Sequence, residues 1–95
     1  MYAAVRRYKF DPKDAAEIDR RVREVFVPMM KKTAGFVAYY WLDDGNGNGA
    51  SMSVFKDKAG ADESIREAAE FVRDNFAGFF VSPPEVVEGH VEAYA

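Results

Sequence analysis

Residues 36–42, FVAYYWL, restrict the fold of this chain more than any other stretch. They are rich in β-branched and aromatic residues and predict a strand, in which successive side chains point to opposite faces of the sheet. One face would carry Phe36, Ala38, Tyr40 and Leu42, and the other would carry Val37, Tyr39 and Trp41. Neither set suits contact with water. The fold must therefore cover both faces of this strand.

The first third of the chain predicts a strand followed by a helix. Residues 2–10, YAAVRRYKF, alternate loosely and favour a strand. Asp11 and Pro12 form a helix-start signal, because an aspartate side chain accepts a free backbone N–H and proline suits the first turn. The apolar positions that follow recur every three or four residues: Ala15, Ile18, Val22, Val25, Phe26, Met29 and Met30. Pro28 predicts a kink or a break in this helix, which should end at Gly35.

The rest of the chain predicts two further strands, a second helix and a last strand. The strand at 36–43 leads through DDGNGNG, whose glycines and asparagines suit a hairpin turn, into a strand at 51–56. A helix follows from DKAGADES, with Asp57 or Asp62 as its cap. Its predicted apolar stripe comprises Ile65, Ala68, Ala69, Val72 and Phe76. Residues 85–95, EVVEGHVEAYA, alternate and predict the last strand.

This order of elements predicts a ferredoxin-like α+β fold, βαββαβ, with an antiparallel sheet and both helices on one face. Ninety-five residues are enough for one such domain, which we place at residues 1–95. The face without helices would carry either the set with Phe36 and Tyr40 or the set with Tyr39 and Trp41. A second copy of the chain, packed sheet to sheet, would cover that face, so we expect a homodimer that forms a dimeric α/β barrel.

Composition narrows the classes of function. The net charge of -3 gives no positive field for a phosphate backbone, so we expect no nucleic-acid partner. Because the chain has no cysteine, disulfide-stapled, thiolate iron–sulfur and thiol-dependent proteins are excluded. The sequence has neither a run of roughly 20 apolar residues, which a membrane span needs, nor the apolar core of a signal peptide at its N-terminus. We therefore expect a cytoplasmic protein without membrane contact.

Four stretches of the chain resemble the dimeric α/β-barrel superfamily, and within it the small proteins related to antibiotic biosynthesis monooxygenases. They are the GFVAYYWLDD strand, the glycine-rich hairpin, the SMSVFKDKAGADES passage and the late PEVVEGHVEAYA strand. The resemblance implies two paired sheets with a pocket in each subunit. It also implies cofactor-free oxygenation or heme degradation as activities. The heme-degrading branch has an asparagine on the first strand and a histidine on the second helix, and this chain has neither, so we expect no cofactor.

His90 is the only histidine and the first candidate catalytic residue. Its reference pKa of about 6.5 lies near neutrality, which suits a general base. A bulge at Gly89 would reverse the face on which His90 lies, so strand parity leaves two orientations open, of which we expect the one into the barrel. The alternative is a solvated histidine on the sheet. A metal site formed with Glu88 and Glu92 would lack a second histidine, so we expect no metal ion.

Tyr39 and Trp41 are the candidate substrate-binding residues, since aromatic rings stack on flat ligands. Arg6 or Arg7, whichever points into the barrel, would hold an anionic oxygen, and we select Arg6 as the second catalytic residue. Two functions stay open. One is cofactor-free oxygenation of an aromatic phenol or quinol. The other is a non-catalytic homodimer that binds a small ligand or has a structural role, in which the aromatic side chains serve packing alone.

Overall fold

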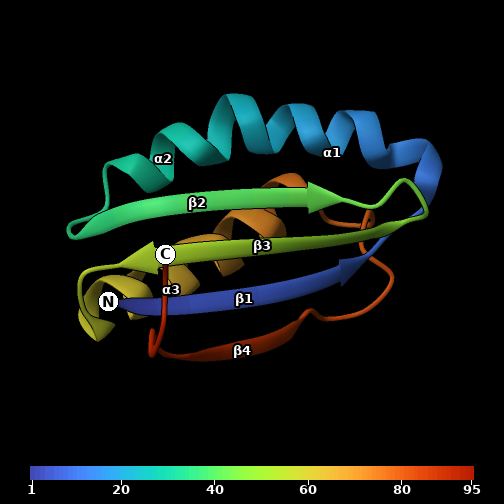
Figure 1. Cartoon of the computed structure of the whole chain (residues 1–95). Helices are drawn as coiled ribbons and strands as arrows, with labels where there is room; N and C mark the ends of the chain where they lie inside the picture. The colour runs from blue at the N-terminus through green and yellow to red at the C-terminus, as the bar shows by residue number, and fades with distance from the viewer.

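The computed structural model describes all residues from 1 to 95. Its strands are β1 (Tyr2–Lys9), β2 (Phe36–Asp43), β3 (Asn48–Phe55) and β4 (Glu85–His90). Its helical segments are η1 (Pro12–Asp14), α1 (Ala15–Arg21), η2 (Val22–Phe26), α2 (Val27–Lys31) and α3 (Lys58–Asn75). This order confirms the predicted ferredoxin-like α+β fold (Figure 1).

The four strands form one antiparallel sheet in the order β2-β3-β1-β4. The helical run from α1 to α2 packs on β2, and α3 packs on β3 and β1 (Figure 1). Both lie on the same face, because the rings of Phe26 in η2 and Phe71 in α3 are in contact, with 4.9 Å between their centroids. The core of the domain therefore lies between this face of the sheet and the single layer formed by the two helical segments.

The helical run continues through Pro28, and the predicted short second helical piece, α2, begins next to the proline, although it ends at Lys31 rather than at Gly35. A π-helical turn, η2, precedes the proline, and the N–H of Val27 donates to the carbonyl of Val22, five residues back. A four-residue spacing drifts around an α-helix of 3.6 residues per turn, and the wider π turn compensates this drift. The buried side chains are accordingly spaced four apart: Ile18, Val22, Phe26 and Met30. Val25, which the α-helical pattern placed in the stripe, is 49% exposed.

The predicted stripe of the second helix is correct for Ala68 and Phe76, which are buried, and wrong for its other members. The buried positions within α3 are Gly60, Ala61, Ser64, Ala68 and Phe71. Ile65 and Val72 are half-buried and Ala69 is exposed, so these three lie at the side of the helix rather than on its buried face. Neither this helix nor any other is long and apolar enough to span a membrane.

Two strand boundaries also differ from the prediction. β3 begins at Asn48 rather than at residue 51, because the turn is completed within residues 44–47, where Gly45 and Gly47 have φ values of 81° and 87°. The side chain of Asp44 accepts the N–H groups of Asn46 and Asn48 and closes this turn. At the other end of the chain, β4 stops at His90, and residues 91–95 form no regular structure.

The face of the sheet without helices is apolar. Its outward side chains include Val5, Ala38, Tyr40, Leu42, Ala50, Met52, Val54 and Val87. Tyr40 and Leu42 are 60% and 66% exposed, whereas Tyr39 and Trp41 face the helices. A β-bulge between Phe36 and Ala38 also turns Phe36 into the core, although alternation placed it with Tyr40. We call this surface the open face.

The structure chooses between the two predicted caps of α3. Asp57 accepts the N–H of Gly60 at 3.0 Å, whereas Asp62 forms an exposed ion pair with Lys58 at 2.8 Å. We expect Asp57→Ala to lower the free energy of unfolding by about 1 kcal/mol, and Asp62→Ala to change it by less than about 0.5 kcal/mol. Urea unfolding of both variants measures the difference. Equal losses in the two variants would contradict the assignment of the cap.

Candidate functional site

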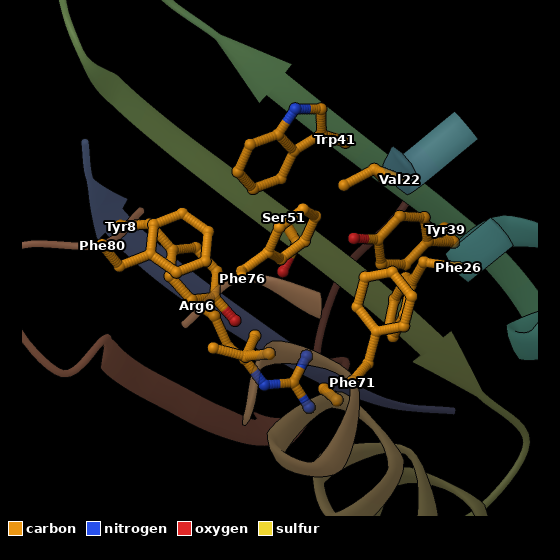
Figure 2. A pocket seen from close by; sticks show the side chains of 12 residues that line it. Arg6, Tyr8, Val22, Phe26, Tyr39, Trp41, Ser51, Phe71, Phe76 and Phe80 are labelled. Carbon is orange, nitrogen blue, oxygen red and sulfur yellow. The ribbon is translucent and has the colours of Figure 1, made fainter. Parts of the chain in front are cut away.

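A small cavity lies between the sheet and the helices (Figure 2). Arg6 and Tyr8 reach it from β1, Tyr39 and Trp41 from β2, and Ser51 from β3. Its other walls are apolar and come from η2, α3 and the segment after α3. The cavity measures about 20 Å³, enough for roughly one water molecule. The side chains around it are therefore nearly close-packed in this conformation.

The alternation of β1 places Arg6 in this cavity. Tyr2, Ala4, Arg6 and Tyr8 are all buried and so share the face under the helices. Arg6 is only 3% exposed; its Nη1 donates to the Oγ of Ser53 at 3.4 Å, and its Nη2 is buried without a hydrogen-bond partner. None of the ion pairs of the chain includes Arg6. The cavity thus carries a buried positive charge with no counter-ion, an arrangement that favours an anion.

Trp41 is held on two sides. Its Nε1 donates to the Oδ1 of Asp19 in α1 at 2.7 Å, and its six-membered ring lies over Gly49 of β3. An ideal Cβ at Gly49 would lie 2.5 Å from the Cη2 atom of Trp41, so only glycine permits this approach. The ring of Tyr8 lies 5.8 Å away between centroids. Trp41 is therefore a fixed wall of the cavity.

The two tyrosines of the cavity are poor bases. Burial raises the pKa of Tyr39 far above its ordinary value, and the nearby phenol of Tyr8 raises it further, while Ser51 and Arg6 act in the opposite direction. Burial also raises the pKa of Tyr8 against the lowering effect of Arg6. Both phenols therefore stay protonated at neutral pH. Figure 2 shows the Tyr39 hydroxyl directed toward Ser51.

Asp19 is a carboxyl at the outer edge of the site. Burial raises its pKa, and the neighbouring carboxyl of Asp43 raises it further, while the indole N–H of Trp41 and the charge of Arg23 lower it. Its contact with the cavity is indirect, through Trp41. Asp19 therefore orients the indole and does not reach a ligand placed inside.

The structure corrects the predicted orientation of His90. His90 pairs with Tyr2 across β4 and β1, and their rings meet edge to face with 5.1 Å between centroids. Because Tyr2 lies under the helices, His90 points to that side rather than to the open face, at the edge of the sheet. It does not line the cavity with Arg6, Tyr39 and Trp41. No group of three or more histidine, aspartate and glutamate side chains has the geometry to hold a metal ion.

The two arginines of β1 have opposite surroundings. Arg7 points to the open face and pairs with Glu85 at 3.7 Å, with both side chains exposed. The sequence predicts that Arg6 points into the barrel, but Arg7 is the arginine on the open face, and Arg6 lies under the helices. The site that Arg6 shares with Tyr39 and Trp41 lies under the helices and not on the open face.

Sequence reasoning missed three polar residues of the site. Tyr8 lies two residues from Arg6 in β1, and this spacing alone puts both on one face. Ser51 and Ser53 alternate with Met52 and Val54. This pattern predicts that the serines are exposed to water and that Met52 and Val54 are buried in the core. The structure has the reverse, with both serines buried and Met52 exposed.

No protein-family model and no curated protein sequence matches the chain. Solved structures do match. A protein of unknown function from Nitrosomonas europaea has a TM-score of 0.85 and 21% identity, with 99% of this chain and 91% of that one covered. A monooxygenase from Streptomyces coelicolor, in complex with the ligand nanaomycin D, has a TM-score of 0.79 and 11% identity, with coverages of 99% and 89%. An antibiotic biosynthesis monooxygenase has a TM-score of 0.77 and 16% identity, with coverages of 98% and 100%.

This chain has the antibiotic biosynthesis monooxygenase fold. The predicted resemblance is thereby confirmed at the level of the fold. Identities of 11–21% carry the arrangement of strands and helices and not the activity.

Gly49 offers a direct test of how Trp41 is held. We expect Gly49→Ala to lower the free energy of unfolding by about 1–3 kcal/mol, because the new methyl group displaces the indole from its contact with β3. Trp41 is the only tryptophan, so its fluorescence should shift as well. The control is Gly89→Ala in β4, where an added Cβ meets no atom within 4 Å. Unchanged fluorescence and stability in Gly49→Ala would refute the contact.

Proposed function

We propose that this protein binds a small aromatic anion between its sheet and helices, with Arg6 holding the anionic oxygen. The observation that carries this proposal is the buried Nη2 atom of Arg6, which has no partner within the chain. A buried charged donor without an acceptor costs free energy that an anionic ligand would recover. Tyr39 and Trp41 supply the aromatic surface for a flat ring.

The reaction we propose is cofactor-free oxygenation of a phenol or quinol. The phenolate, held by Arg6, transfers electrons to molecular oxygen, and a carbon–oxygen bond forms at the ring carbon opposite the phenolic oxygen. The resulting hydroperoxide loses water: its O–O bond breaks, the ring C–H proton leaves, and a second carbonyl forms. The balance is phenol plus O₂ to quinone plus H₂O, with the substrate as the only reductant.

The site holds no base for this reaction. Tyr8 and Tyr39 stay protonated, and His90 lies at the edge of the sheet. The substrate must therefore lose its own proton, and the role of Arg6 is to lower the pKa of the bound phenol by stabilising the phenolate. The monooxygenase from Streptomyces coelicolor with a small ligand supports the assignment of this fold to such a function.

The second candidate function is a non-catalytic protein that binds a small ligand or has a structural role. The size of the cavity favours it, because a benzene-sized ligand needs about 150 Å³ and the cavity offers about 20 Å³. Under this function the aromatic side chains serve packing, and oxygen is not consumed.

Oxygen uptake with α-naphthol tests the first function. We expect Arg6→Gln to lower kcat/KM by about 100-fold, as loss of one oxyanion donor does, while Arg7→Gln on the opposite face leaves it unchanged. Because no protein base is involved, the rate of the unmodified protein should rise with pH along the ionisation of the phenol. A more acidic phenol should move this rise to lower pH by the difference between the two phenol pKa values. A profile that stays fixed for both phenols would overturn the mechanism, and no uptake with either phenol would leave the second function.

We further propose that two copies of the chain pair through the open face as a homodimer. The support is the apolar character of this face, where Tyr40, Leu42 and Met52 are each more than 40% exposed. These side chains belong to the adjacent strands β2 and β3, so the apolar surface spans this half of the sheet.

A charge on the open face should separate the two copies. We expect Met52→Glu, at a position 43% exposed, to halve the mass measured by sedimentation at micromolar concentration. The control is Val86→Glu, at a position 47% exposed on the other side of the sheet, which should leave the mass at twice 10.7 kDa. A mass of 10.7 kDa for the unmodified protein would refute the dimer.

A further inference from the structure

The two helical segments, which lie on one face of the sheet, leave one edge of that face uncovered. α3 packs on β1 and β3, while the neighbouring strand β4 is exposed along most of its length. Val86 of β4 pairs with Arg6 and therefore points to the helix side, yet it is 47% exposed. An open groove of about 330 Å³ follows this edge between α3 and β4. We call it the edge groove.

The edge groove adjoins the cavity. Four residues line both spaces: Arg6, Tyr8, Ala68 and Val72. The remaining wall of the groove is mainly apolar and comes from the side of α3, with Ile65 and Ala69, from Val86 of β4 and from Pro84 just before this strand. This explains why Ile65 and Val72 of α3 lie outside the buried stripe. They face the groove instead.

Size separates the two spaces. A cavity of about 20 Å³ holds no aromatic ring, whereas a groove of about 330 Å³ lies within the range of roughly 300–1,000 Å³ that is typical of small-molecule sites. A ligand therefore meets the groove first. Two cations line the groove. Arg73 is paired with Asp74 at 3.0 Å, so Arg6, which has no carboxylate partner, is the unpaired cation available to the anionic end of the ligand.

We propose that the edge groove is the binding site and entrance for a monoanionic ligand with a flat apolar body. On entry the body lies between Ile65 of α3 and Val86 of β4, and the anionic oxygen approaches Arg6 past Val72. Contact of the ring with Tyr39 and Trp41 then requires the cavity to widen. This inference rests on the proposed role of Arg6 as an anion site, and it adds where the ligand lies and which residues select its shape. Phenolates and aromatic carboxylates share the chemistry that the groove recognises.

Methyl resonances test the position of the ligand. The chain has two isoleucines, Ile65 at the groove and Ile18, which is fully buried in the core and lines neither space. We expect titration of the dimeric protein with β-naphthoate to shift the δ1-methyl signal of Ile65 and to leave that of Ile18 in place. Shifts confined to Met52 and other open-face methyl groups would overturn the proposal.

A matched pair of variants tests the contribution of the groove. Val86→Glu adds a negative charge to the groove, and we expect it to weaken β-naphthoate binding by about tenfold or more through like-charge repulsion. Val25→Glu, at a position of η2 that is 49% exposed and lines neither space, adds the same charge away from the groove and from the open face, and should leave the affinity unchanged. Equal affinities in the two variants would refute the groove as the binding site.

The two proposals fail in different ways. Binding of β-naphthoate that shifts Ile65 and is lost in Val86→Glu, without oxygen uptake on α-naphthol, would retain the groove and remove oxygenation. Oxygen uptake that is equal in Val86→Glu and Val25→Glu would retain oxygenation and remove the groove. Arg6→Lys, which keeps the charge, should bind β-naphthoate more tightly than Arg6→Gln; equal binding would remove Arg6 as the anion site.

Discussion

The buried guanidinium group of Arg6 is the interaction on which the rest of the site depends. Removal of a charged group from water costs several kcal/mol, and one hydrogen bond to Ser53 offsets only part of this cost. A 95-residue domain has a small free energy of unfolding, so an unpaired buried charge removes a large fraction of it. An unpaired buried charge is typical of a group that binds a ligand, and Arg6 lines the space where such a ligand would bind.

The position of α3 explains both the burial of Arg6 and the exposure of β4. Gly60 near the start of α3 lies against the sheet, since an added Cβ would come within 2.8 Å of the carbonyl of Ala34 and 3.0 Å of the ring of Phe55. This close approach keeps the helix above β3 and β1, where it covers Arg6. The same placement leaves no helix above β4. One packing constraint therefore produces the closed cavity and the open groove beside it.

The sequence predicted the order of the elements and restricted the cap of α3 to Asp57 or Asp62, because these features depend on local spacing and local hydrogen bonds. The errors arose where the backbone departs from ideal geometry. A π turn removed Val25 from the buried stripe, and a β-bulge moved Phe36 into the core. The orientation of His90 depends on its pairing with Tyr2, which is far away in the sequence. No local pattern carries that register, so the sequence predicted Arg6, Tyr39 and Trp41 together but grouped His90 with them wrongly.

The chemistry of the site follows from what surrounds the cation. Burial keeps the phenols of Tyr8 and Tyr39 protonated, so Arg6 is the one charged group in the cavity, and its effect on a bound phenol is to favour the phenolate. Each unit by which the pKa of the ligand falls corresponds to about 1.4 kcal/mol of preferential binding to the anion. Selection for an acidic ligand and activation of that ligand are then the same electrostatic effect. Because Arg6 favours the phenolate, the site does not need a histidine as a base, which agrees with the position of His90 outside the cavity.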